Sequence, residues 1–325
     1  MAKLVIGTNK QTVIPAVVRD MSPEIYRVFR VNNGKIENSV STPFLPLPNT
    51  ATDINDYCYV FAYSHTPASV LSGAINLSSL TTLTGVNACY YMFTGCTGIT
   101  SVDLSSLTTV RASSACSNMF QDCTGITSID LSNLTTLSGS NGCRFMFQGC
   151  TGITSVDLSS LTTISASSAC NYMFSDCTGL TSVNLSGLTA ISNTSGAANM
   201  FQYCTGITSI DLSNLTTLSG SGACQSMFTG CAGLTSVNLS GLTTFTGRNA
   251  CQYMFQNCIS LATVYIGGTT AIDFGTLTNQ FSSMFVGCSQ NIDVYAPAAN
   301  QTQIEAFSGY PNFGGTGTVT WHWRS

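Results

Sequence analysis

Hydrophobic residues return at the same places along most of the chain, with a period of about 27 residues, which is in the range typical of solenoid repeats. The dipeptide Met-Phe marks this period most plainly. It begins at Met92, Met119, Met146, Met173, Met200, Met227 and Met254, and once more at Met284 after a slightly longer gap. A fixed period in this range predicts a solenoid, in which each repeat forms one coil and buries its apolar side chains only against neighbouring coils.

One hydrophobic pattern within the period predicts a short strand. Ile99, Val102, Leu104 and Leu107 have equivalents in the following repeats, and their spacing is the LxxLxL pattern of a leucine-rich repeat. Because alternate side chains of a strand share one face, these residues are expected to point inward.

A second pattern predicts a short helix. Cys116, Met119, Phe120 and Cys123 stand at offsets 0, 3, 4 and 7, which places all four on one face of an α-helix. Gly125 follows shortly after, and glycine there suits the left-handed position that ends a helix.

The combined motif CxxMFxxCTGITSVDLSSLTT resembles the BspA-like leucine-rich-repeat proteins, including the longer-period form found in bacterial surface lipoproteins and in some phage proteins. The resemblance covers roughly residues 58–295, and the stretch Val294–Pro297 with Gln303–Phe307 looks like the terminal cap of that family. It implies an extracellular binding or adhesive role without catalysis. The chain departs from plant and animal leucine-rich repeats at Leu107, where those carry a buried Asn.

We therefore predict an α/β repeat solenoid, a leucine-rich-repeat array of about eight short-strand plus short-helix coils over residues 58–295. A small β-rich N-terminal unit and linker, residues 1–57, is expected to attach the protein to an assembly or to cap the first coil. The pair Asn33-Gly34 between alternating residues predicts a hairpin there. Residues 296–325 are expected to form a C-terminal capping segment that ends in a strand around Trp321 and Trp323.

The 15 cysteines favour packing over chemistry. Two cysteines of one predicted helix lie about 10.5 Å apart, which is too far for a disulfide. Bonds between coils remain geometrically possible. However, Ala197 replaces cysteine in one repeat, so we interpret the columns as buried, reduced thiols that act as small hydrophobes. With only two histidines and no CxxC motif, neither a metal site nor a cofactor is predicted.

Charge is scarce, which excludes several classes of function. Charged residues make up 7% of the chain, and the net charge is −4, so nucleic acid is not an expected partner. No apolar run approaches the ~18–20 residues that span a bilayer. His65 and His322 stand at opposite ends of the array, so no catalytic triad is suggested and the protein is not expected to be an enzyme.

Two outward columns are candidate ligand-binding surfaces. On the strands, polar residues recur between the inward ones, and they either solvate the strand or collect cations or ligand hydroxyls. The aspartates of this column are Asp103, Asp130, Asp157 and Asp211. On the outer face of the predicted helices, residues vary while the scaffold repeats, in a Tyr, Asn and Ser vocabulary like that of antibody paratopes. Unconstrained drift at solvent positions would also produce such variation. The candidates here are Tyr91, Asn118, Phe145, Tyr172, Asn199, Tyr203 and Tyr253.

The N-terminus decides between two functional hypotheses. Residues 1–10 lack the apolar region of a signal peptide, which indicates synthesis in the bacterial cytoplasm. We therefore expect a non-enzymatic virion surface protein, such as a phage tail-fibre, receptor-binding or capsid-decorating component. Its partners would be a host surface protein or glycan and, through the N-terminal unit, other virion proteins, with homo-oligomers possible and no membrane insertion. The alternative is a bacterial cell-surface or secreted adhesin. Ice binding is a third hypothesis, because pairs such as Thr108/Thr109 form ladders.

Overall fold

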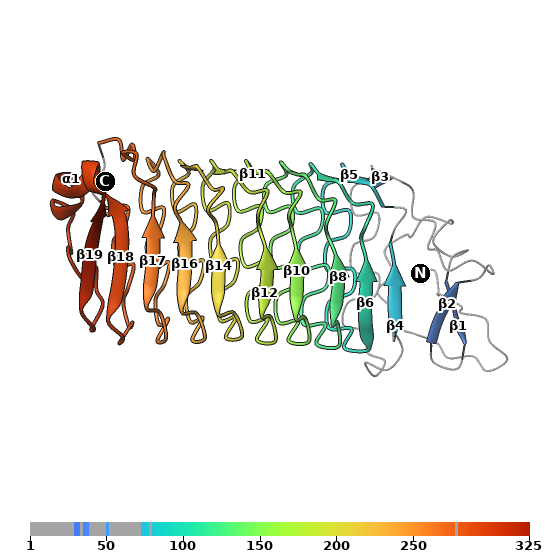
Figure 1. Cartoon of the computed structure of the whole chain (residues 1–325). Coiled ribbons are helices and arrows are strands. Elements are labelled where there is room, and N and C mark those ends of the chain that lie inside the picture. Colours follow the sequence, from blue (N-terminus) through green and yellow to red (C-terminus); the bar gives the residue numbers. More distant parts are fainter. Residues whose placement is uncertain (1–28, 33–34, 39–49, 52–72, 78–79, 277–278) are drawn as a thin grey trace.

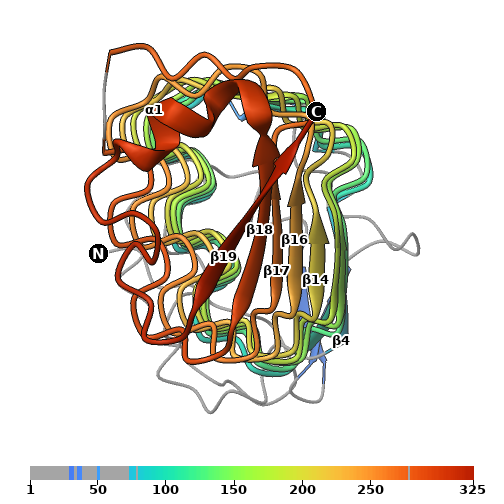
Figure 2. The same cartoon turned by 60° about the vertical axis from the view of Figure 1, so that its left-hand side comes forward.

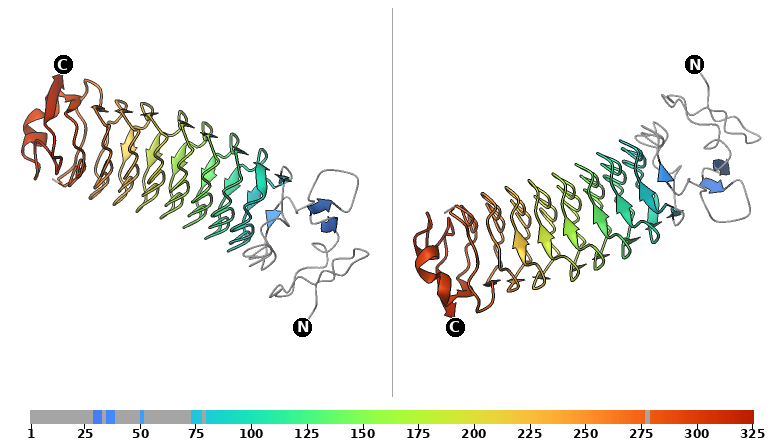
Figure 3. Two further views of the ribbon diagram at one scale, coloured as in Figure 1. Left: turned by 90° about the horizontal axis from the view of Figure 1, so that it is seen from below. Right: turned by 90° about the horizontal axis from the view of Figure 1, so that it is seen from above.

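The chain forms a parallel β-solenoid. The computed structural model describes residues 29–32, 35–38, 50–51, 73–77, 80–276 and 279–325. About nine turns stack along one axis, and each turn follows nearly the same path as the one before it (Figure 1 and Figure 3). The predicted array of leucine-rich-repeat coils is therefore confirmed.

One side of the coils carries short strands. These strands lie side by side along the array and are parallel to one another (Figure 1). They form hydrogen-bonded groups in the orders β4-β6-β8, β10-β12 and β14-β16-β17-β18-β19. We call their outward side the strand face. Their bounds are β4 Gly73–Asn76, β6 Ile99–Asp103, β8 Ser128–Asp130, β10 Ser155–Asp157, β12 Ser182–Asn184, β14 Ser209–Asp211, β16 Ser236–Leu239, β17 Thr263–Ile266, β18 Ile292–Pro297 and β19 Val319–Arg324.

A second ladder of two-residue strands follows after a bend in each coil. These strands form one seven-stranded parallel sheet in the order β15-β13-β11-β9-β7-β5-β3. Their bounds are β3 Thr50–Ala51, β5 Thr82–Leu83, β7 Thr109–Val110, β9 Thr136–Leu137, β11 Thr163–Ile164, β13 Ala190–Ile191 and β15 Thr217–Leu218. Thr109 pairs with Thr136, its equivalent in the next coil, so equivalent side chains line up in columns.

The remaining side of the coil is a chain of tight turns, and the predicted helix there is wrong. Figure 2 shows these turns opposite the strands. The N–H of Met119 donates to the carbonyl of Cys116, three residues back, whereas the N–H of Phe120 donates to the carbonyl of Met146 in the next coil. An α-helix needs its N–H groups for carbonyls four residues back. Bonding every second N–H to the next coil therefore excludes a helix. We call the outward side of these turns the turn face.

The turns depend on a left-handed residue at every fourth position. In one coil these residues are Ser114, Asn118 and Asp122, with φ of 55°, 59° and 58°. Short polar residues tolerate this conformation because their side chains bond locally to the backbone. Spacing of four also keeps offsets 0, 3, 4 and 7 inward, so the burial that the pattern predicts is correct although the helix is not.

Stacked columns fill the core. The side chains of Cys116, Met119, Phe120 and Cys123 are fully buried, and each large apolar side chain buried in this way contributes about 1.5–3 kcal/mol. The Met-Phe phenylalanines form a continuous stack of nearly parallel rings. Their centroid spacing starts at 5.0 Å between Phe93 and Phe120 and reaches 6.0 Å near the C-terminal end.

Gly125 does not adopt the left-handed conformation that the helix hypothesis assigned to it. Its role is close approach, because a Cβ on Gly125 would lie 2.2 Å from the carbonyl oxygen of Thr97 in the preceding coil. Equivalent glycines at Gly152 and Gly179 meet carbonyl oxygens at 2.7 and 2.3 Å. Neighbouring coils can therefore stack at this corner only without a side chain.

The two ends differ from the repeats. β1 (Phe29–Asn32) and β2 (Lys35–Asn38) pair antiparallel, as predicted for the hairpin; the rest of the expected N-terminal unit, together with the linker prolines and His65, falls outside the described residues except for β3. At the other end, β19 pairs parallel with β18, which confirms the predicted terminal strand. The short helices η2 (Ala298–Asn300) and α1 (Gln301–Glu305) lie across the last coil (Figure 2).

Candidate ligand-binding surfaces

The aspartates of the strand face point outward as predicted, and each has a local structural task. Oδ1 of Asp157 accepts a hydrogen bond of 2.9 Å from the backbone N–H of Ser159, two residues on. Asp103, Asp130 and Asp211 accept from the equivalent N–H at 2.9–3.0 Å. Side chains of this kind close the turn that ends the strand, and Asn does so in other coils. The column therefore has a structural explanation that needs no ligand.

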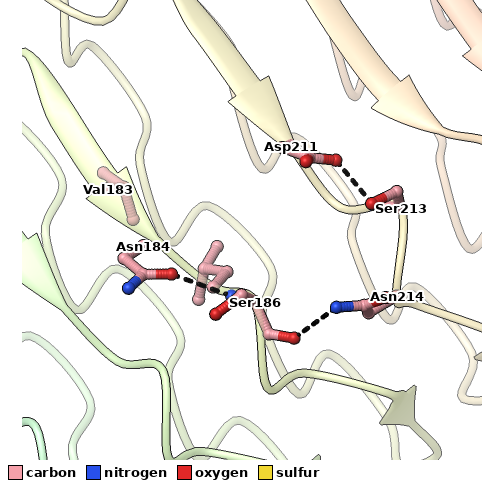
Figure 4. Close-up of a pocket in the computed structure, with 7 residues that line it drawn as sticks. Val183, Asn184, Ser186, Asp211, Ser213 and Asn214 are labelled. Carbon is pink, nitrogen blue, oxygen red and sulfur yellow. Dashed lines mark hydrogen bonds between the residues drawn. The ribbon is translucent and has the colours of Figure 1, made fainter.

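A hollow on the strand face is small. It has a volume of about 110 Å³ between β12 and β14, where Asn184, Ser186, Asp211, Ser213 and Asn214 line it (Figure 4). Small-molecule pockets usually enclose about 300–1,000 Å³. The Asn214 amide also donates to the Ser186 carbonyl at 2.6 Å, so this corner is tied together internally and is not shaped as a ligand pocket.

The turn face carries the other candidates, and all seven occupy left-handed positions. Their φ values lie between 55° and 59°. Tyr91, Phe145, Tyr172, Asn199 and Tyr253 are partly exposed, and Tyr203 is 45% exposed. Asn118 is the exception. It is only 5% exposed, so its predicted outward exposure is wrong.

Aromatic side chains at left-handed positions are unusual and require an explanation. A left-handed residue other than glycine costs roughly 1–2 kcal/mol. Phe145 and Tyr172 recover part of this by stacking, with ring centroids 4.9 Å apart. Tyr203 instead leans over Gly230 of the next coil, where a Cβ would lie 2.2 Å from its ring. Asn fills the same column at Asn199 without aromatic contacts, so the fold itself does not require aromatic residues there.

The sequence reasoning missed Arg144. Its guanidinium lies 4.6 Å from the centroid of the Phe145 ring, and its buried Nε has no hydrogen-bond partner. Within the described part of the chain, the one ion pair joins His322 to Asp293, so no carboxylate there neutralises Arg144. The sequence did contain a signal for Arg144, because it is a cation next to variable aromatic residues in a chain that has few charges.

A chain of side-chain hydrogen bonds borders the aromatic column and was also missed. Asn118 donates to Gln121 at 2.7 Å, Gln121 donates to Gln148 at 3.0 Å, and Gln148 donates to Asp176 at 3.4 Å. The chain crosses three coils. Burial raises the pKa of the Asp122 carboxyl, which Asp176 raises further. The turn face thus combines rings, amides and carboxyl groups over neighbouring coils.

The cysteines line the interior behind the turn face. All fourteen described cysteines are buried, as expected for packing groups. In the column that lacks exceptions, the thiol donates to a backbone carbonyl of the preceding coil, for example from Cys204 to Phe174 at 3.0 Å. This bond explains why cysteine recurs there. Burial raises the pKa of Cys231 to about 12, so the thiol stays protonated and unreactive near neutral pH.

Other candidate chemistry is limited. Among the described residues, no group of three or more His, Cys, Asp or Glu side chains could hold a metal ion, and no helix there is long and apolar enough to cross a bilayer. The threonine ladder is real, but its hydroxyls are engaged. Thr135 Oγ1 donates to the Thr108 carbonyl at 3.0 Å, and Thr216 Oγ1 to that of Thr189 at 3.1 Å.

A parallel solenoid with a regular core and a variable outer face is the architecture of a leucine-rich-repeat binding scaffold, a class that is typically non-enzymatic. The sequence profile of the BspA type leucine rich repeat region matches in overlapping segments, residues 31–168, 68–195, 144–282 and 199–312. The chain belongs to this family. No curated protein matches the sequence.

Similar solved structures come from bacteria. A leucine-rich repeat protein of Bacteroides ovatus is 16% identical, with 91% of this chain and 98% of that chain covered, at a TM-score of 0.21. A leucine rich cell surface protein of Faecalibacterium prausnitzii is 15% identical, with 90% and 92% covered and a TM-score of 0.29. The internalin InlF of Listeria monocytogenes is 12% identical, with 89% and 68% covered and a TM-score of 0.32. The virion hypothesis gains no support from the family, and the bacterial-surface alternative fits it better.

Proposed function

We propose that this protein is a non-enzymatic adhesin or ligand-binding protein of a bacterial cell surface, and that the turn face of its solenoid contacts the ligand. Membership of the BspA type leucine-rich-repeat family supports the class. One observation carries the choice of face. Tyr or Phe stands at left-handed positions such as Tyr91, Phe145 and Tyr253, where Asn would meet the needs of the backbone with less strain.

Exposed aromatic residues suit this role because each offers a large contact area and loses little conformational freedom on binding. An extended surface also fits the shape of the molecule, since a stacked array presents one long face per side. On the strand face, by contrast, the equivalent column is occupied by side chains that close turns.

The test is surface labelling in the bacterium that produces the chain. A membrane-impermeant biotin reagent is applied to intact cells, and a cytoplasmic enzyme serves as the control for lysis. We expect labelling of this chain without labelling of the control. Labelling only after lysis, or recovery of the chain with phage-sized particles on a gradient, would contradict the proposal. Purified full-length chain added to the same cells should also reduce their adherence to a surface that bears the ligand, because it competes for that ligand.

A further inference from the structure

The region around Arg144 is the part of the turn face where several independent features meet. Arg144 and Phe145 belong to one coil, Tyr172 to the next, and Tyr91 to the coil two before. Arg144 lies over the Phe145 ring at 4.6 Å and acts electrostatically on Tyr91, whose pKa it lowers against the larger effect of burial. Arg144 therefore interacts with aromatic side chains of its own coil and of the coil two before. We call Tyr91, Asn118, Arg144, Phe145 and Tyr172 the Arg144 cluster.

The coil between the aromatic residues is covered. Ser117 and Asn118 are 2% and 5% exposed, although they stand at outward-pointing positions of their turn. Both are therefore shielded from solvent, whereas Arg144 and Phe145, at the same positions of the next coil, are partly exposed. Arg144 is held at this surface by ring contact and not by an ion pair, because no carboxylate among the described residues lies within reach.

Two buried polar atoms in this region lack partners. Nε of Arg144 has no acceptor, and Oδ1 of Asn171, which occupies the equivalent position in the next coil, has no donor. Asn171 is 8% exposed. Buried polar groups without partners destabilise the folded chain. The cluster also contains two large rings at left-handed positions, at Phe145 and Tyr172. Strain and unmet hydrogen bonds together are typical of a surface shaped for a ligand.

We propose that the Arg144 cluster binds an acidic saccharide, a pyranose that carries a carboxylate. Arg144 would hold the carboxylate, and the neighbouring rings would contact the C–H surface of the sugar. This inference rests on the proposed function and adds the ligand class.

Three features favour this chemistry. A guanidinium binds a carboxylate through paired hydrogen bonds. Aromatic rings offer an apolar surface with a directional electrostatic field for C–H groups. The partly exposed amides of Gln121 and Gln148 run beside the cluster and supply the donors and acceptors that hydroxyl groups need.

Other ligand classes fit less well. Nucleic acid requires many cations, whereas this chain has a net charge of −4. A peptide that adds as a strand needs free backbone N–H groups. On the turn face those groups are used, as when the N–H of Asn118 donates to the carbonyl of Arg144 and that of Phe145 to Asn171.

The test is calorimetric titration of the full-length chain with 3′-sialyllactose, with lactose as the neutral counterpart and a hexaglutamate peptide as the second acidic class. We expect the sialylated sugar to bind and lactose to bind at least about tenfold more weakly. Arg144→Gln should weaken binding of the sialylated sugar by about tenfold or more, since a charge-assisted bidentate contact is lost. Arg248→Gln is the matched control, because Arg248 is exposed and stands in a distant coil, and it should bind as the unaltered chain does.

A second variant separates binding from structure. Phe145→Asn places at this position the residue that Asn118 and Asn199 already show to be compatible with the turn, so the variant should keep its thermal midpoint while its affinity falls by about tenfold. Equal binding of lactose, preferred binding of the peptide, absence of binding by the acidic sugar, or unchanged affinity in Arg144→Gln would each overturn the inference. Surface labelling of intact cells is independent of these outcomes, so the proposed function can stand when this inference fails.

Discussion

The strand face and the turn face belong to the same coils, yet the outward residues of the strand face are nearly constant and those of the turn face vary. On the strand face, Asp or Asn closes a turn in coil after coil, as Asp157 does for the N–H of Ser159. On the turn face, the residue at one left-handed position changes from Asn118 to Phe145 to Tyr172. A column with a fixed hydrogen-bond task keeps one chemistry. A column that requires only a residue compatible with a positive φ can vary in side chain, so its residues can serve binding.

The comparison teaches where stability and recognition lie. The turns need only a residue that tolerates a positive φ, and their N–H groups are already bonded within the turn or to the next coil. Outward side chains there are therefore free to serve a partner at a modest cost in strain. Perturbing the molecule should accordingly have its largest effect at the buried thiols and its smallest at the exposed tyrosines.

Alkaline pH should unfold the array through the turn side, because all the described cysteines belong to it. Burial raises the pKa of Cys224 to about 12 in the folded chain, against 9.0 for an ordinary thiol. As pH rises above 9, unfolded thiols lose protons that folded thiols keep, so unfolding is favoured by about 1.4 kcal/mol per thiol at pH 10. We expect the midpoint of thermal unfolding, followed by circular dichroism, to fall steeply between pH 9 and 11.

Cys224→Ala is the matched variant for this prediction, since Ala197 fills the equivalent place in another coil. The dependence of its unfolding free energy on pH should be shallower by one proton. A midpoint that stays level up to pH 11 would contradict the buried-thiol explanation.

Gly125→Ala should destabilise the chain by about 3 kcal/mol, because the new Cβ would meet the Thr97 carbonyl oxygen at 2.2 Å. Gly222→Asn is the control. Gly222 has a φ of 61° on the turn side, and Asn stands at the equivalent left-handed position at Asn249. We expect a change within about 0.5 kcal/mol there, measured by denaturant titration. Equal effects of both substitutions would show that close approach between coils is not the constraint.

Asp157→Ala should cost about 1 kcal/mol, since the N–H of Ser159 loses its acceptor at the end of β10. Asp157→Asn should be close to neutral, because Asn184 accepts the same bond in the next coil. The measurement is again denaturant unfolding of the full chain. A neutral alanine variant would remove the structural explanation for the aspartate column and reopen its role in binding.

Tyr253→Asn should stabilise the chain by about 1 kcal/mol or less, because Asn relieves left-handed strain. Tyr253 has a φ of 57°, and its neighbours in the column, Ser226 and Ser283, offer no ring for stacking. A small rise in the thermal midpoint would place stabilising and destabilising substitutions on opposite faces of the solenoid. A fall would mean that Tyr253 contributes to folding and would weaken the case for the turn face as a recognition surface.

The fold was largely predictable from the sequence because burial follows the period directly. Ile99, Val102, Leu104 and Leu107 are buried as their spacing required. The helix was wrong because offsets 0, 3, 4 and 7 suit both a helix and turns with a left-handed residue at every fourth position. The recurrence of Ser, Asn, Asp and Gly at that spacing was the signal that separates the two.

The candidate surfaces were less predictable. The aspartates were correctly placed outward, and their bond to the N–H two residues on is a local preference that the Asp-x-Ser sequence carries. Arg144 was not among the candidates, since its contact with the Phe145 ring and its unpartnered Nε follow from the folded turn and not from sequence spacing. Asn118 was expected to be exposed because sequence spacing gives the direction of a side chain and not the size of its neighbours.

The matching of one coil to the next also bears on how such a chain changes length. The donors and acceptors that one coil offers recur in the same order in the coil after it, so a segment of one period can be added or removed between any two coils without leaving an unmatched seam. Each such step alters the reach of the molecule by about 4.8 Å. Recombination between near-identical repeats thus adjusts the distance between the two ends in uniform increments. Each added coil keeps the same core residues and adds another set of outward positions.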